Sequence, residues 1–229
     1  RCAQSDSQFH AMSTFPIDFH DAGSASLDDP DALARMDAIW QDNVRQMAEC
    51  AKSRGWEVEE PTREAGLSSL KLQVLEKRMG RSIPPQFRWA IEQSAAWSLS
   101  WSCYDMVDSP PSKLAHCSNG GIYNGVWTGH ELDGMQDRLK SWVEMHAGWT
   151  EDDELGAQLI AFWGTHFAFA HLPNGDMLAI DTRNPDPQQQ GVRYFSHEED
   201  GPHGELMSVD FFTFISGWRA LGCVGSEWW

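Results

Sequence analysis

Residues 158–182 carry the clearest β signal in the chain, and they read Gln-Leu-Ile-Ala-Phe-Trp-Gly-Thr-His-Phe-Ala-Phe-Ala-His-Leu-Pro-Asn-Gly-Asp-Met-Leu-Ala-Ile-Asp-Thr. Two runs rich in apolar residues, 158–172 and 177–182, flank the connection Pro173-Asn174-Gly175-Asp176. An Asn-Gly pair tolerates the positive φ angles that a tight hairpin turn requires. The stretch therefore predicts two antiparallel strands joined as a β-hairpin.

Upstream of this hairpin, the sequence predicts a long amphipathic helix after a polar lead-in over residues 1–28. Asp29-Pro30 is typical of a helix start, and Gly55 ends the pattern. The apolar residues between them recur every three or four positions, which predicts one buried stripe. These residues are Leu33, Met36, Trp40, Val44, Met47 and Ala51.

Two shorter helices are predicted next. The first covers about 69–78, with Gly80 as its stop, and we expect Leu70, Val74 and Leu75 to face inward. The second follows Ile83-Pro84-Pro85 and buries Phe87, Ala90, Ile91 and Ala95. Residues 97–106 then alternate large apolar with small polar side chains, which predicts a half-buried strand.

The rest of the chain alternates between strands, loops and helices. We expect strands at 121–127 and 191–197, and helices at about 133–147 and 208–222. The segment 183–190 is rich in Pro, Asp and Gln and is predicted to be a loop. Residues 151–154 and 198–205 are predicted to be acidic loops.

Charge restricts the partners of this 229-residue chain. Its 34 acidic and 17 basic residues give a formal net charge of −17. Duplex nucleic acids and anionic membranes both need Lys and Arg for neutralisation, so neither is expected as a ligand. The charge favours a basic partner, although high net charge also serves plain solubility. The sequence has no run of 18 apolar residues of the kind that spans a membrane.

The cysteines and the N-terminus indicate the compartment. Five scattered cysteines without a CxxC pair are typical of buried thiols in a reducing environment. The first residues, Arg1-Cys2-Ala3-Gln4-Ser5, lack the charged and apolar regions of a signal peptide, and Met12 is a candidate natural start. We therefore expect a cytoplasmic protein.

Four motifs follow one another along the chain. They are a Leu-Glu…Gly helix at 75–80 with an Ile-Pro step at 83–88, a Gly-Asp…Asp strand at 175–182, a strand with an acidic turn at 191–201, and a Phe- and Trp-containing helix at 208–222. Their order resembles the SMI1/KNR4 (SUKH) family, and the first motif is similar to the opening of these domains. Residues 175–182 resemble the central Gly-Asp…Asp strand of the family, and 191–201 resemble the next strand with its acidic turn. Residues 208–222 are similar to the closing Phe- and Trp-containing helix.

The resemblance implies an α+β fold: a mixed, mainly antiparallel sheet of about six strands flanked by helices, with the N-terminal helix as an addition. Residues 1–60 would form a tail and helical extension, and 61–229 the SMI1/KNR4-like domain. Bacterial members are commonly immunity proteins that bind a cognate secreted toxin, and fungal members are regulatory scaffolds. We therefore expect a non-enzymatic immunity protein that occludes the active site of a basic, nuclease-like toxin. A regulatory scaffold without a toxin is the alternative.

The residues expected to contact the partner are acidic loops and aromatic anchors. Carboxylates that gather at one end of the sheet would attract Lys and Arg of the toxin, and large aromatic rings commonly anchor interfaces. The candidates are Glu151, Asp152, Asp153, Glu154, Glu198, Glu199, Asp200, Trp127 and Trp149. Solvated surface loops are the plainer interpretation of the same acidic runs.

Chemical sites are weakly indicated. His197 and His203, with Glu198–Asp200 near them, suggest a metal-dependent hydrolase as a remote alternative, but a Gly- and Pro-containing loop fixes no ligand geometry. Asp176 and Asp181 lie five positions apart on the predicted strand and would face opposite sides, so they do not form a catalytic pair. The sequence contains neither a nucleophile motif nor a nucleotide-binding motif. We expect no metal and no cofactor.

Overall fold

The computed structural model describes residues 22–53, 57–98, 101–102, 132–149, 161, 164–172, 175–196 and 203–220. Within these residues the helices are α1 (Pro30–Ser53), α2 (Ser69–Met79), α3 (Pro85–Gln93), α4 (Leu132–Trp149), the 3₁₀ turn η2 (Pro187–Gln189) and α6 (Phe211–Ala220). The strands are β1 (Glu57–Val58), β2 (Thr62–Ala65), β3 (Ser94–Ser98), β4 (Trp101–Ser102), β5 (His166–His171), β6 (Met177–Asp181), β7 (Val192–Phe195) and β8 (His203–Ser208).

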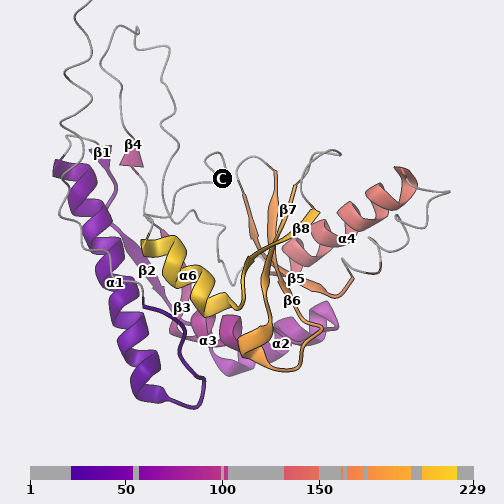
Figure 1. The fold of residues 1–229 in the computed structure, drawn as a ribbon, viewed down its shortest axis with the longest axis horizontal. Coiled ribbons are helices and arrows are strands. Elements are labelled where there is room, and N and C mark those ends of the chain that lie inside the picture. The colour runs from indigo at the N-terminus through magenta and orange to yellow at the C-terminus, as the bar shows by residue number, and fades with distance from the viewer. Residues whose placement is uncertain are drawn as a thin grey trace, which may run out of the picture.

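An antiparallel sheet of four strands in the order β5-β6-β7-β8 forms the centre of the molecule (Figure 1). The predicted hairpin is confirmed: β5 pairs with β6, and His166 lies opposite Asp181. Every residue of β6 is buried, so the sheet is covered on both faces at this strand. The described strands also form the separate two-stranded pairs β1-β4 and β2-β3, and every pairing is antiparallel. The α+β fold class is therefore confirmed.

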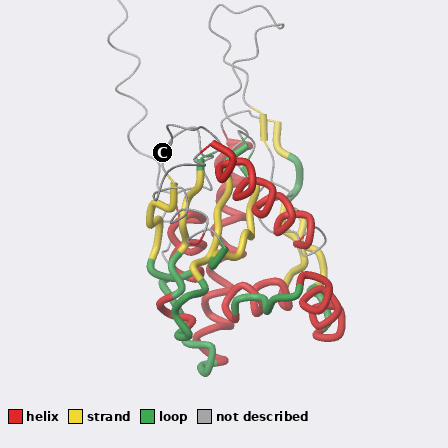
Figure 2. Tube along the Cα trace, turned by 90° about the vertical axis from the view of Figure 1, so that its right-hand side faces the viewer, coloured by secondary structure: helices red, strands yellow, loops and turns green. Residues whose placement is uncertain are grey.

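Helices cover the sheet from different sides. Helix α4 packs against β5, and α3 and α6 pack against each other. Viewed from the side of α4, Figure 2 shows that helix in front of the strands and further helices behind them. At the edge of the sheet, the Gln136 side chain of α4 bonds to both the backbone N–H and the carbonyl of Ala168. These bonds satisfy backbone groups at the edge of β5.

The N-terminal helix α1 contributes buried residues to the same hydrophobic core as the sheet and the other helices. Leu33, Met36, Trp40, Val44 and Met47 of the predicted stripe are all buried. In Figure 1, α1 runs along the side of the molecule next to α6, and the two helices contact each other. The apolar spacing thus predicted correctly which face of α1 turns inward.

Aromatic rings join the helices to the sheet. Phe87 of α3 lies 5.7 Å from Phe169 of β5 and 5.3 Å from Phe211 of α6, measured between ring centroids.

At the start of α6, the buried Asp210 accepts a hydrogen bond from the N–H of Thr213. This cap satisfies one of the unpaired amides at the helix N-terminus. Gln86 of α3 accepts a second bond, from the N–H of Phe212.

Helix α2 presents a different face from the one predicted. Leu72 and Leu75 are buried, whereas Leu70 and Val74 are 71% and 58% exposed. The expectation that Leu70 and Val74 face inward is therefore wrong. Both stripes have helical spacing, and only packing against the rest of the domain decides which one is covered.

Other boundaries also differ from the predictions. The helix that contains Phe87 ends at Gln93, so the buried Ala95 belongs to β3. Strand β8 begins at His203, inside the predicted acidic loop 198–205. Strands β1 and β2 had no sequence signal of their own. The predicted strand at 121–127 lies outside the described residues.

No helix in the described part of the chain is both long and apolar enough to cross a membrane.

Candidate functional site

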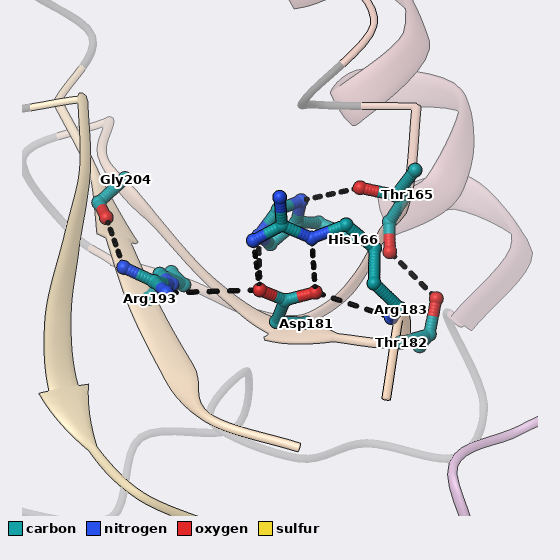
Figure 3. Close-up of polar contacts among 7 residues, drawn as sticks. All are labelled: Thr165, His166, Asp181, Thr182, Arg183, Arg193 and Gly204. Atoms are coloured by element: carbon teal, nitrogen blue, oxygen red, sulfur yellow. Dashed lines mark hydrogen bonds and ion pairs between the residues drawn. The ribbon is translucent and has the colours of Figure 1, made fainter. Parts of the chain in front are cut away.

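A polar cluster lies at the end of β6 where the apolar strand finishes in Asp181 (Figure 3). The Asp181 carboxylate accepts hydrogen bonds from the backbone N–H of Arg183 at 3.1 Å and from its Nε at 2.8 Å. It also accepts a bond from Arg183 Nη2. A guanidinium bound by both of its edge nitrogens is fixed in direction as well as in position. Arg183 is thereby held at the surface, with its side chain 48% exposed.

Two neighbouring strands bring further groups to Asp181. Nη2 of Arg193, from β7, lies 3.7 Å from Oδ2 of Asp181, and Nη1 donates to the carbonyl of Gly204 on β8. Nε2 of the fully buried His166, from β5, lies 3.8 Å from the same carboxylate oxygen. The carboxylate thus links β5, β6 and β7.

The ion pairs control the acidity of Asp181. Burial raises the pKa of this carboxyl, but hydrogen bonds from the Arg183 side chain and backbone, with the charges of His166 and Arg183, lower it more strongly. The net pKa lies below the ordinary value of 3.8. Asp181 is therefore ionised at neutral pH and is a poor proton acceptor for catalysis.

The loop that follows Asp181 is ordered by its own side chains. Asn184 accepts from the N–H of Asp186 and donates to Gln189 at 3.0 Å. Asp186 in turn caps η2 by accepting from the N–H of Gln188. The predicted loop character of 183–190 is confirmed, apart from this one 3₁₀ turn.

An open depression of about 510 Å³ adjoins the cluster. It is lined by Asp181, Arg183, Asn184, Pro185 and Gln189. Its walls combine a fixed guanidinium with amide groups and a proline ring, which suits recognition of polar protein groups. Among the described residues that line it, the carboxylate of Asp181 already binds Arg183, so its polar groups are fixed in place as a binding surface requires.

The second predicted carboxylate, Asp176, lies at the other end of β6. It is buried and accepts a hydrogen bond from the hydroxyl of Tyr194. Asp176 and Asp181 are five positions apart along extended chain, about 16 Å at 3.3 Å per residue. The two aspartates therefore do not form a catalytic pair.

The predicted contact residues cannot be placed in this cluster. Glu151, Asp152, Asp153, Glu154, Glu198, Glu199, Asp200 and Trp127 lie outside the described residues. Trp149 is the last residue of α4, and its side chain is likewise outside the description. His203 begins β8, whereas His197 is not described. Among the described residues, no group of three or more His, Cys, Asp or Glu side chains is arranged to hold a metal ion.

Sequence reasoning missed the cluster because Arg183 and Arg193 are ten positions apart and His166 is remote from both. One signal was present: Asp181 ends a strand that is otherwise apolar. A carboxylate in such a position usually has a charged or hydrogen-bonded partner.

The same strands lie within the part of the chain that matches a known family. The model of the SMI1/KNR4 family (SUKH-1) matches residues 66–217, well over half of the sequence. The chain belongs to this family. The SMI1/KNR4 match begins just before α2 and ends inside α6, so it includes the polar cluster and excludes α1. Comparison with curated proteins and with solved structures finds no match.

Within this SMI1/KNR4 domain, Asp181→Asn is expected to lower the free energy of unfolding at neutral pH by roughly 2 kcal/mol. The substitution removes the charged acceptor of the Arg183 bonds. Because folding lowers the pKa of Asp181, the carboxylate stabilises the protein above pH 3.8, and this contribution is lost as the pH falls through the lower folded-state pKa. Urea unfolding between pH 2.5 and pH 7 should therefore show a flatter acid limb in the variant.

Asp186→Asn is the matched control for this measurement. Asp186 is an exposed carboxylate of the same loop, and asparagine retains an oxygen that can accept from the N–H of Gln188. We expect its stability to stay within about 0.5 kcal/mol of wild type. Equal losses in the two variants would show that the Asp181 ion pairs contribute no stability of their own.

Proposed function

We propose that this chain is an immunity protein that binds a cognate bacterial toxin and neutralises it by covering the active site. Membership of the SMI1/KNR4 family, which includes immunity proteins, is the observation that carries the proposal. The mechanism needs one stable complex per toxin molecule and no turnover. The polar cluster at Asp181, which favours recognition over catalysis, is consistent with it.

The net charge of −17 supports a basic toxin as the partner. A protein with this charge attracts a cationic partner over distances beyond contact, which raises the association rate. Many nucleases carry basic clefts because they bind phosphates, so a nuclease-like toxin fits this requirement. The partner is a protein, and the site of action is the cytoplasm of the producing cell.

The proposed contact surface consists of the acidic runs 151–154 and 198–200, with Trp127 and Trp149 as anchors. In this arrangement the carboxylates pair with Lys and Arg of the toxin cleft, and the indole rings supply desolvated contact area. The depression beside Arg183 is a further candidate contact, because its polar groups are already held in place.

Co-expression tests the function directly. The gene neighbouring that of this chain is expressed as a candidate toxin in a sensitive host, with and without the chain. We expect growth to be restored only when the chain is present, and the two proteins to co-purify as a complex of fixed stoichiometry. A toxic neighbour that the chain neither rescues nor binds would contradict the immunity proposal and favour a regulatory scaffold.

The association rate of the complex should depend strongly on salt. Raising the salt from low to near-molar concentration is expected to slow association by roughly tenfold or more, because screening removes the long-range attraction. Stopped-flow mixing measures this rate. The triple variant E198Q/E199Q/D200N should associate more slowly at low salt and show a weaker salt dependence.

The control for this variant, D28N/E59Q/D137N, removes the same number of negative charges from exposed described positions. If the acidic runs lie at the interface, E198Q/E199Q/D200N should associate with the toxin more slowly than the control variant. Equal rates would mean that only the total charge steers the partner. A rate independent of salt in the wild type would exclude the electrostatic mechanism.

A further inference from the structure

Helix α2 has an exposed face that combines aliphatic and cationic side chains. Leu70 and Val74 are one turn apart, and Lys77 follows Val74 by three positions, so the three side chains lie on one face. Leu70 and Val74 are among the most exposed large apolar residues of the described chain, at 71% and 58%. The opposite face carries Leu72 and Leu75 into the core.

The charge of α2 is opposite to that of the whole chain. The helix contains Lys71, Lys77 and Arg78 against the single acidic residue Glu76, a net charge of +2 in a protein of −17. Lys71 and Lys77 are exposed, and no ion pair among the described residues involves either of them. Arg78 pairs with Asp133 of α4 but remains half exposed.

The nearby carboxylates do not neutralise the outward face. Glu76 turns back toward α3, where it accepts from the N–H of Ile83 and pairs with Arg88 at 2.9 Å. Glu92, near the start of α2, pairs with the same Arg88 and accepts from the hydroxyl of Ser69. The face around Leu70 and Val74 therefore presents cations without a matching acid from α2 itself.

Helix α2 is capped at both of its ends. Ser68 caps its N-terminus by accepting from the N–H of Lys71, and Gly80 ends it in the left-handed conformation at φ 68°. Both caps satisfy backbone groups that would otherwise fray the short helix. A preformed helix loses little conformational entropy on binding.

We propose that the outward face of α2 is a docking surface for an acidic amphipathic segment of a partner protein. Aliphatic or aromatic side chains of that segment would pack against Leu70 and Val74, and its carboxylates would pair with Lys71 and Lys77. At physiological salt the Debye length is about 8 Å, so a docked segment responds to these local cations more than to the distant acidic residues. Its residues are different from the acidic runs proposed to meet a basic toxin.

An unbiased peptide selection tests this inference without a known partner. A phage library of random 16-residue peptides is selected on the full chain, with the variant L70A/V74A for counter-selection. Alanine keeps α2 helical, and circular dichroism with thermal unfolding verifies that the variant is folded. We expect the enriched peptides to be net acidic with apolar residues at helical spacing.

The affinity of the best peptide then identifies the surface. Binding, followed by fluorescence anisotropy, should weaken at least about tenfold in L70A/V74A and in K71Q/K77Q. The matched control L206A/V209A truncates the same two residue types where they are 51% and 59% exposed, near the end of β8. It should bind like the wild type.

Any one of four results would overturn the inference. The selection would enrich no peptide over the counter-selected background, or it would enrich neutral or basic peptides. Alternatively, sedimentation would show that the wild type dimerises and L70A/V74A does not, which would assign the face to a second copy of the chain. Binding to anionic lipid vesicles through Lys71 and Lys77, without selective peptide binding, would assign it to a membrane surface. None of these measurements uses the toxin, so they succeed or fail independently of the immunity proposal.

Discussion

Replacing Gly66 with alanine is expected to destabilise the protein by roughly 3–5 kcal/mol, among the largest losses that a single methyl group can cause. A Cβ atom at Gly66 would lie 1.8 Å from the carbonyl oxygen of Glu92 and 2.5 Å from its carbonyl carbon. Backbone atoms cannot rotate away as the end of a side chain can. The adjacent N–H of Leu67 donates to the carbonyl of Ile91 at 2.9 Å and holds the two segments together.

The structural consequence extends beyond this contact. Gly66 connects β2 to α2, and Glu92 lies at the end of α3, so separating them disturbs the junction between these elements. The melting temperature should fall by roughly 10 °C, as measured by differential scanning calorimetry. Urea unfolding at 25 °C gives the change in the free energy of unfolding.

Gly134→Ala is the matched control. Gly134 lies in α4, and a Cβ atom built there would have no heavy atom within 4 Å apart from the backbone of its own helix and its chain neighbours. Alanine favours the helix over glycine, so this variant should be more stable by up to about 1 kcal/mol. If both variants change stability alike, the close approach of Gly66 to Glu92 does not constrain the fold.

Trp40→Ala is expected to lower the free energy of unfolding by about 3–5 kcal/mol. The Trp40 ring is buried, and its centroid lies 6.2 Å from that of Trp89 and 5.9 Å from that of Phe212. Its Nε1 donates to the hydroxyl of Ser216 at 2.9 Å, and this hydroxyl donates to the carbonyl of Gly23. Truncation would leave a cavity between α1, α3 and α6 and remove one buried hydrogen bond.

This variant tests whether α1 unfolds together with the family domain, because α1 lies outside the match over 66–217. We expect Trp40→Ala to unfold in one cooperative urea transition, monitored by far-ultraviolet circular dichroism. The midpoint of this transition should lie at a lower urea concentration than in the wild type. Trp40→Phe keeps an aromatic ring and loses the indole N–H, so its loss should be smaller. Gln41→Ala, at an exposed position of α1, should change stability by less than about 0.5 kcal/mol.

Two outcomes would contradict this prediction. Separate transitions for the N-terminal helix and the remainder would show that the helical extension predicted over residues 1–60 unfolds independently of the family domain. A loss below about 1 kcal/mol in Trp40→Ala would show that the contacts with Trp89 and Phe212 add little stability.

Local patterns predicted much of the fold because they are physical properties of short segments. The hairpin at 158–182 follows from Asn174-Gly175 between two apolar runs, and β5 and β6 confirm it. The stripe of α1 follows from residue spacing, and Trp40 is buried as predicted. The start of α3 at Pro85 and its buried Phe87 were also predicted correctly.

Predictions failed where two local patterns compete. Helix α2 has two apolar stripes, one through Leu70 and Val74 and the other through Leu72 and Leu75. Residue spacing cannot rank them, because the choice depends on which surfaces of α3, α4 and the sheet are available. Packing of α2 against the rest of the domain therefore determines that Leu70 and Val74 lie at the surface. Strand β8 was missed for a similar reason. Its polar, Gly-containing sequence does not favour a strand, and β8 is extended because it pairs with β7.

The α+β class, the central hairpin and the family of this protein could all be predicted from the amino-acid order, since each rests on the identity and order of neighbouring residues. The cluster of Asp181 with Arg183, Arg193 and His166 could be seen only in the folded protein, as could the exposed aliphatic face of α2 among its cations. The Asp181 cluster brings together groups from different strands. The aliphatic face of α2 is exposed because the opposite face of the same helix is buried. Long-range packing sets these relations, and they leave no periodic signal along the chain.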